Sequence, residues 1–134
     1  MIVVAIIGIL AAIAIPNFLR FQAKSKQSEA KTNLGGIFTA ETSYFAENNV
    51  YGTFSQIAWA PVGTKQIYTY WSNSTDSKFP PGGSATTWAG GPNVGIYASG
   101  FSAGAIGNVD SDATLDVWHI NDVKNLSNDQ DDVT

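Results

Sequence analysis

The sequence predicts an α+β protein, in which one long N-terminal helix packs with its distal half on a sheet of three to four antiparallel strands. Three observations predict this arrangement. The first fifteen residues are all apolar or glycine. A helical spacing of apolar residues then continues to about residue 47. Beyond it, short segments rich in β-branched and aromatic residues alternate with turn-forming residues.

The first element is the apolar stretch of residues 1–19. A helix rises about 1.5 Å per residue, so this stretch reaches roughly 28 Å, which is close to the hydrocarbon thickness of a bilayer. We assign residues 1–22 to a protruding hydrophobic helix that lies in lipid or in the dry core of an assembly. Pro16 has no amide hydrogen, so a kink or local melting is expected near it. A simple signal anchor is the alternative, and a cleavable signal peptide is disfavoured because no basic residue precedes the run.

The second half of the helix is amphipathic. Its apolar residues recur at steps of three and four along one face: Ala30, Leu34, Ile37, Phe38, Ala40, Tyr44 and Phe45. We therefore expect the helix to continue over residues 23–48 and to end near residues 47–49. This face is the natural partner of the sheet.

The rest of the globular domain, which spans residues 23–134, follows from its turn and strand signals. Residues 49–65 read as a loop whose aromatic residues pack back on the helix. Within residues 66–121, strands are predicted at 66–72, 94–101 and 113–121, with a polar, turn-rich excursion at 73–93. The acidic tail, residues 122–134, is expected to be loosely held.

Composition excludes several classes of function. The chain has no cysteine, so disulfides and thiolate chemistry are excluded. The net charge is −4, and most acidic residues lie in the distal half, which argues against nucleic-acid binding. His119 is the single histidine, and it lies in a predicted strand beside no nucleophile motif. No catalytic residues and no organic cofactor are therefore predicted, and the protein is not expected to be an enzyme.

Three aspartates form a candidate metal site. Asp110, Asp112 and Asp116 follow the pattern D-x-D-x-x-x-D, and closely spaced carboxylates suit Ca²⁺. The pattern lacks the glycine and glutamate of an EF-hand. A turn capped by aspartate side chains is the alternative interpretation. Asn73 also begins an N-glycosylation sequon, as does Asn125.

The N-terminal run closely resembles one protein family. The sequence MIVVAIIGILAAIAIPNFLRFQAKSKQSEAKTNL is similar to the start of type IV pilins, and GNVDSDATLDVWHI near the end looks like major pilins of the myxobacterial and delta-proteobacterial kind. The N-terminal match covers about a quarter of the chain. Beyond residue 47, only the general layout and this C-terminal motif agree.

The resemblance implies an inner-membrane precursor, processed by a prepilin peptidase, that the pilus assembly machinery builds into an extracellular filament. It also implies that a short stretch with an N-methylated phenylalanine and a glutamate would come before Met1 in the mature protein. In the family this glutamate guides docking. No residue of the present sequence takes that role, so the chain is expected to lack the first residues of the mature N-terminus. The alternative is that this form assembles without them.

We therefore predict a structural subunit that polymerises with other copies into a type IV pilus for motility or adhesion. The alternatives are a type II secretion pseudopilin or minor pilin and, in another class, a membrane-anchored monomeric binding protein that uses residues 73–93. We assign assembly to apolar residues in the first half of the helix: Met1, Ile2, Val3, Val4, Ile6, Ile7, Ile9, Leu10, Ile13, Ile15, Pro16 and Phe18.

Overall fold

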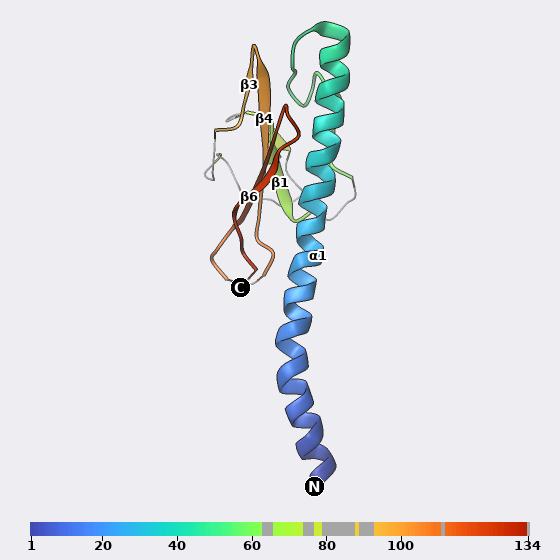
Figure 1. Ribbon diagram of the computed structural model, residues 1–134, viewed down its shortest axis with the longest axis vertical. Coiled ribbons are helices and arrows are strands. Elements are labelled where there is room, and N and C mark those ends of the chain that lie inside the picture. Colours follow the sequence, from blue (N-terminus) through green and yellow to red (C-terminus); the bar gives the residue numbers. More distant parts are fainter. Residues whose placement is uncertain (63–65, 74–76, 79–87, 89–92, 111, 134) are drawn as a thin grey trace.

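The fold consists of one long helix packed on one antiparallel sheet (Figure 1). The computed structural model describes residues 1–62, 66–73, 77–78, 88, 93–110 and 112–133. Only the upper half of the helix in Figure 1 lies beside the sheet, and the lower half projects away from the domain. The elements in chain order are α1 (Ile2–Asn48), β1 (Tyr68–Trp71), β2 (Ser77–Lys78), β3 (Gly95–Tyr97), β4 (Gly100–Gly107), β5 (Asp116–Asn121) and β6 (Leu126–Gln130).

Helix α1 has the extent that the sequence predicts. It continues through Pro16, so the local melting that a proline could cause there does not occur. It ends where Asn49 adopts the left-handed conformation, with φ of 55°. Asparagine tolerates this conformation well, and its backbone N–H donates to the carbonyl of Phe45 at 2.8 Å. This cap fixes the exit of the chain into the following loop.

The sheet is entirely antiparallel, with β4 near its centre. The strand order is β2-β1-β4-β5-β6, and β3 also pairs with β4. The register places Ala105 of β4 between Tyr70 of β1 and Trp118 of β5. One step of the pleat further along this face, Gly107 lies between Tyr68 and Asp116. Small residues on β4 thus leave room for large side chains from both neighbouring strands.

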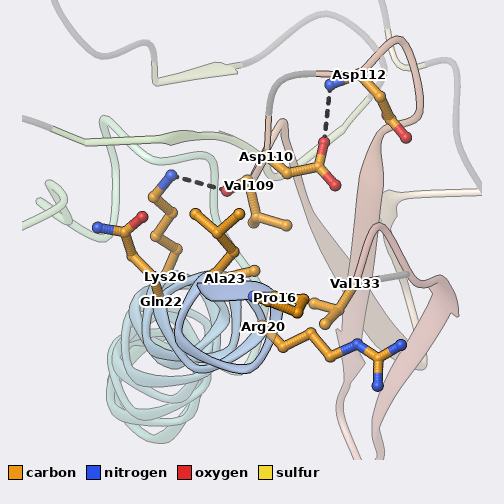
Figure 2. A pocket seen from close by; sticks show the side chains of 10 residues that line it. Pro16, Arg20, Gln22, Ala23, Lys26, Val109, Asp110, Asp112 and Val133 are labelled. Carbon is orange, nitrogen blue, oxygen red and sulfur yellow. Dashed lines mark hydrogen bonds between the residues drawn. The ribbon is translucent and has the colours of Figure 1, made fainter. Parts of the chain in front are cut away.

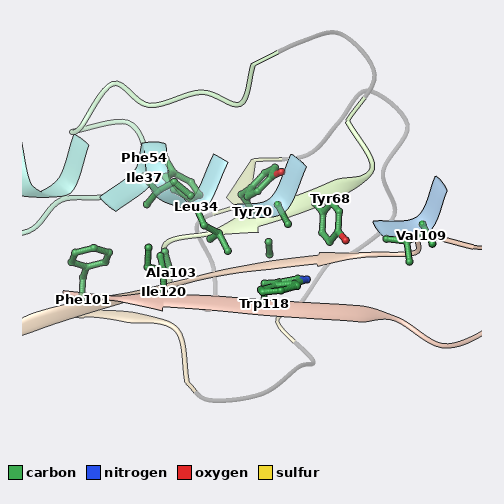
Figure 3. Packing of buried hydrophobic residues seen from close by; sticks show 13 residues of the cluster. Leu34, Ile37, Phe54, Tyr68, Tyr70, Phe101, Ala103, Val109, Trp118 and Ile120 are labelled. Carbon is green, nitrogen blue, oxygen red and sulfur yellow. The ribbon is translucent and has the colours of Figure 1, made fainter. Parts of the chain in front are cut away.

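The hydrophobic core lies between the second half of α1 and this face of the sheet (Figure 3). Leu34 and Ile37 of α1 are fully buried there, together with Phe54 from the loop that follows the helix. Burying a large apolar side chain stabilises the fold by about 1.5–3 kcal/mol. The sheet contributes Tyr68, Tyr70, Phe101, Ala103, Ala105, Trp118 and Ile120.

Several strand predictions need correction. The described residues hold six strands rather than three or four. The predicted strand at 94–101 is the hairpin of β3 and β4, because Ala98 and Ser99 form a turn between Tyr97 and Gly100. Most of β4 was not predicted, since its glycines and alanines resemble a loop. The prediction of a loosely held tail is wrong, because β6 pairs with β5 over residues 126–130.

Residues 113–115 precede β5 rather than belonging to it, so the third predicted strand begins too early. The predicted strand at 66–72 is confirmed as β1, which is shorter by two residues at its start and by one at its end. The excursion at 73–93 lies largely outside the described residues. Its described part includes β2, which pairs with β1.

Candidate functional site

The first half of α1 presents an exposed apolar surface. An 18-residue window of the helix is long and apolar enough to cross a membrane, and none of that window is buried in the structure. Every assembly residue named from the sequence is exposed, as are Leu19 and Phe21, which that assignment left out. Both continue the same apolar run. The first buried residue of α1 is Ala23, so the apolar surface ends where the sheet domain begins.

A groove of about 540 Å³ lies where the projecting half of α1 meets the domain (Figure 2). Pro16, Leu19 and Ala23 line its helix side, and Val109 and Val133 line the opposite side. The Lys26 amine donates to the backbone carbonyl of Val109 at 2.7 Å and ties the two sides together. Asp110 and Asp112 lie at the edge of this groove, above Val109 in Figure 2.

Asp116 is the hydrogen-bond centre that fixes α1 on the sheet. Its side chain is fully buried. Oδ2 accepts from the Tyr68 hydroxyl at 2.5 Å and from the Trp118 indole N–H, and Oδ1 accepts from the Gln27 amide at 2.9 Å. Tyr68 reaches across Gly107, where an added Cβ would lie 2.8 Å from the tyrosine ring. A buried carboxylate must be hydrogen-bonded to be tolerated, so this network positions helix and sheet together.

The same cluster holds the C-terminal segment. The Gln27 amide, which donates to Asp116, also donates to the carboxylate of Asp131 at 2.8 Å. The backbone N–H of Asp132 donates to Asp116 at 3.3 Å, and Asn128 of β6 donates to it at the same distance. The tail is therefore anchored by polar contacts as well as by pairing with β5.

A second polar link lies further along α1. The Asn33 amide donates to the Tyr70 hydroxyl at 2.8 Å, and that hydroxyl lies 3.4 Å from Glu29. Glu29 also accepts from the backbone N–H of Ile67 at 3.1 Å. Burial raises the pKa values of both Tyr68 and Tyr70 above the usual 10, and the hydrogen bond to Asp116 raises the Tyr68 pKa further.

These tyrosines predict a loss of stability at alkaline pH. Below pH 10, tyrosine is protonated in both the folded and the unfolded chain. Above it, the unfolded chain releases protons that folded Tyr68 and Tyr70 retain. Stability should fall by up to about 1.4 kcal/mol per pH unit for each of them. Thermal unfolding of the full chain in detergent micelles, followed by circular dichroism from pH 9 to 12, measures this loss.

The variant Tyr68→Phe should show a shallower alkaline loss than the wild type, whereas Tyr97→Phe, at a half-exposed position, should keep the wild-type slope. The ultraviolet absorbance of tyrosinate provides a second readout. If all five tyrosines ionise near pH 10 while the fold stays intact, the inferred burial is wrong.

The structure regroups the aspartates that the sequence suggested as metal ligands. Asp110 and Asp112 lie together, but the third member of their group is Asp132, and one carboxylate oxygen from each lies within 4.8 Å of the others. Asp116 is not a member of this group, and its carboxylate accepts the hydrogen bonds of Tyr68, Trp118 and Gln27. Asp132 was missed because the tail was expected to be loosely held. Asp131 beside it is acidic as well, like the loop at residues 110–112. No local sequence pattern connects this loop with the tail.

The remaining predicted positions are scattered. His119 on β5 forms a hydrogen bond between its Nδ1 and the carboxylate of Asp129 on β6, at 2.6 Å. Of the first sequon, Asn73 is described and partly exposed, while its threonine lies outside the described residues. Asn125 lies in the exposed turn between β5 and β6. The structure does not bring these residues together with the aspartates at the groove.

Comparisons with known proteins agree with this architecture. No protein-family model matches the chain. The chain is 38% identical to the type IV major pilin protein PilA of Myxococcus xanthus, over 90% of this chain and 75% of that protein. A shorter match, 47% identical over 51 residues, joins it to the fimbrial protein EcpC of Eikenella corrodens and covers a third of that protein. With an exposed apolar helix, an antiparallel sheet packed on its second half, and similarity to a major pilin over most of its length, the chain belongs to the type IV pilin family.

Proposed function

We propose that this chain is the structural subunit that polymerises into a type IV pilus through the first half of α1. The observation that carries this proposal is the exposed apolar surface of residues 1–22 beside a domain that has its own complete core. Each exposed Ile, Leu, Val or Phe side chain would gain about 1.5–3 kcal/mol on leaving water. A surface of this size needs an apolar environment.

Two environments satisfy that need at different stages. Before assembly, the helix lies in the inner membrane, since its length and composition suit a bilayer. After assembly, it lies among the helices of other copies in the core of an extracellular filament. The pilus machinery moves the subunit between the two, and the loss of apolar contact is small because both environments are dry.

The similarity to a major pilin over 90% of the chain supports this function over a secretion pseudopilin or a membrane-anchored monomer. The role is structural. Motility and adhesion are the uses that we assign to the filament, and the chain is proposed to act with other copies of itself rather than on a substrate or a nucleic acid.

Immunogold electron microscopy tests the proposal. Antibodies raised against the domain should label filaments sheared from the cell surface along their whole length. Immunoblots should find the same chain in the inner-membrane fraction as well. Label at filament tips alone would indicate a minor pilin, and label confined to the membrane would indicate an anchored monomer. Either result would contradict the proposal.

A further inference from the structure

We infer a binding site for a divalent cation of the calcium class at Asp110, Asp112 and Asp132, where the C-terminal segment meets the loop between β4 and β5. One oxygen of each carboxylate lies within 4.8 Å of the others. A site of carboxylate oxygens alone suits hard cations such as Ca²⁺ rather than metals that prefer nitrogen or sulfur. This inference is independent of the proposed assembly function.

The burial and the hydrogen bonding of the Asp132 side chain point to a ligand. Its side chain is fully buried, and Oδ2 accepts from the backbone N–H of Val109 at 2.9 Å. Its Oδ1 is buried without any hydrogen-bond partner in the described structure. A buried carboxylate oxygen without a partner is costly, and a cation bound between Asp132 and its two neighbours would satisfy it.

The two exposed aspartates are held in place by the loop itself. Asp110 accepts from the backbone N–H of Asp112 at 2.9 Å, and Asp112 accepts from that of Thr114 at 2.6 Å. The Asn108 amide donates to the backbone carbonyl of Asp112 at 2.7 Å. These contacts fix two carboxylates beside the buried one, so little ordering of the loop would be required when a cation binds.

Among the side chains that the structure describes, no lysine or arginine pairs with the carboxylates of this cluster. The carboxylate of Asp129 instead lies 2.6 Å from the His119 ring, on another part of the sheet. The nearby Lys26 donates to a backbone carbonyl instead. Three carboxylates so close together repel one another when they are ionised. A divalent cation would turn this repulsion into a link between the tail and the loop.

Calcium titration of the full chain in detergent micelles, after treatment with a chelator, tests the inference. Isothermal titration calorimetry with Ca²⁺ alone should give one site per chain. The thermal midpoint should rise by about 5–10 °C at Ca²⁺ concentrations a hundredfold above the dissociation constant. The same ionic strength of sodium chloride should not reproduce this rise.

The variant Asp112→Asn alters an exposed ligand and should fold normally, yet it should weaken Ca²⁺ binding at least tenfold. Asp132→Asn should abolish the calcium-dependent shift. The matched control Asp122→Asn removes an exposed carboxylate outside the cluster and should bind Ca²⁺ like the wild type. Absence of binding at millimolar Ca²⁺ would overturn the inference, as would an unchanged affinity in Asp112→Asn.

Discussion

Replacing Asp116 with alanine is expected to destabilise the folded domain by about 2–5 kcal/mol. The Tyr68 hydroxyl and the Trp118 indole N–H both donate to this carboxylate, and each would be left buried without its acceptor. An unsatisfied buried donor costs about 1–3 kcal/mol. Urea unfolding of the full chain in detergent micelles, followed by circular dichroism, measures the change.

Asp129→Ala is the matched control, because it removes a carboxylate that pairs with His119 near the surface. A single hydrogen bond of this kind contributes about 0.5–1.5 kcal/mol, so this variant should lose less stability than Asp116→Ala. Equal destabilisation in the two variants would show that Asp116 does not hold helix and sheet together in the way described.

Placing a carboxylate in the projecting helix is expected to abolish filament assembly while leaving the domain intact. Ile13 is 61% exposed and lies within the apolar half of α1. An aspartate at the centre of a membrane-spanning helix costs about 3 kcal/mol on insertion scales. Ile13→Asp should therefore yield no sheared filaments by electron microscopy, and it should partly leave the membrane fraction.

The near-ultraviolet circular dichroism and the unfolding midpoint of Ile13→Asp should match the wild type, since the projecting half lies outside the hydrophobic core. Ile13→Leu keeps the volume and apolar character of the site, and it should assemble normally. Filaments of wild-type number and length in Ile13→Asp would exclude this part of the helix from the assembly surface.

The helix could be predicted from sequence because its signals are local. The apolar run, the amphipathic spacing after it and the asparagines at its end all lie within one continuous stretch. Strand β1 likewise consists of four consecutive aromatic or β-branched residues. Local patterns of this kind determine an element before tertiary contacts form.

Strands β4 and β6 could not be predicted in this way. Strand β4, with the sequence GFSAGAIG, is stabilised by large side chains of its neighbours that need the space its small residues leave. Strand β6, with the sequence LSNDQ, has weak strand propensity. It forms because β5 supplies hydrogen-bond partners and because the Asn121 side chain accepts the Asn125 backbone N–H in the turn. Both depend on residues that are distant in sequence or on a specific turn.

The aspartates illustrate the same limit at the candidate site. Asp116 lies in a sequence pattern with Asp110 and Asp112, but strand register turns it toward Tyr68 and Gln27. Asp132 enters the cluster only because β6 returns the tail to the loop that follows β4. Sequence spacing identified two of the three clustered carboxylates, and tertiary topology determined the third.

The row of polar contacts along α1 also has a mechanical consequence. The projecting half makes few contacts with the domain, so a pull on it reaches the sheet through residues 23 onward. Within two turns of the helix, four side chains form hydrogen bonds with the sheet domain: Lys26, Gln27, Glu29 and Asn33. A tensile load along the helix axis is therefore shared by several bonds side by side, together with the packing of Leu34 and Ile37, rather than breaking them one after another.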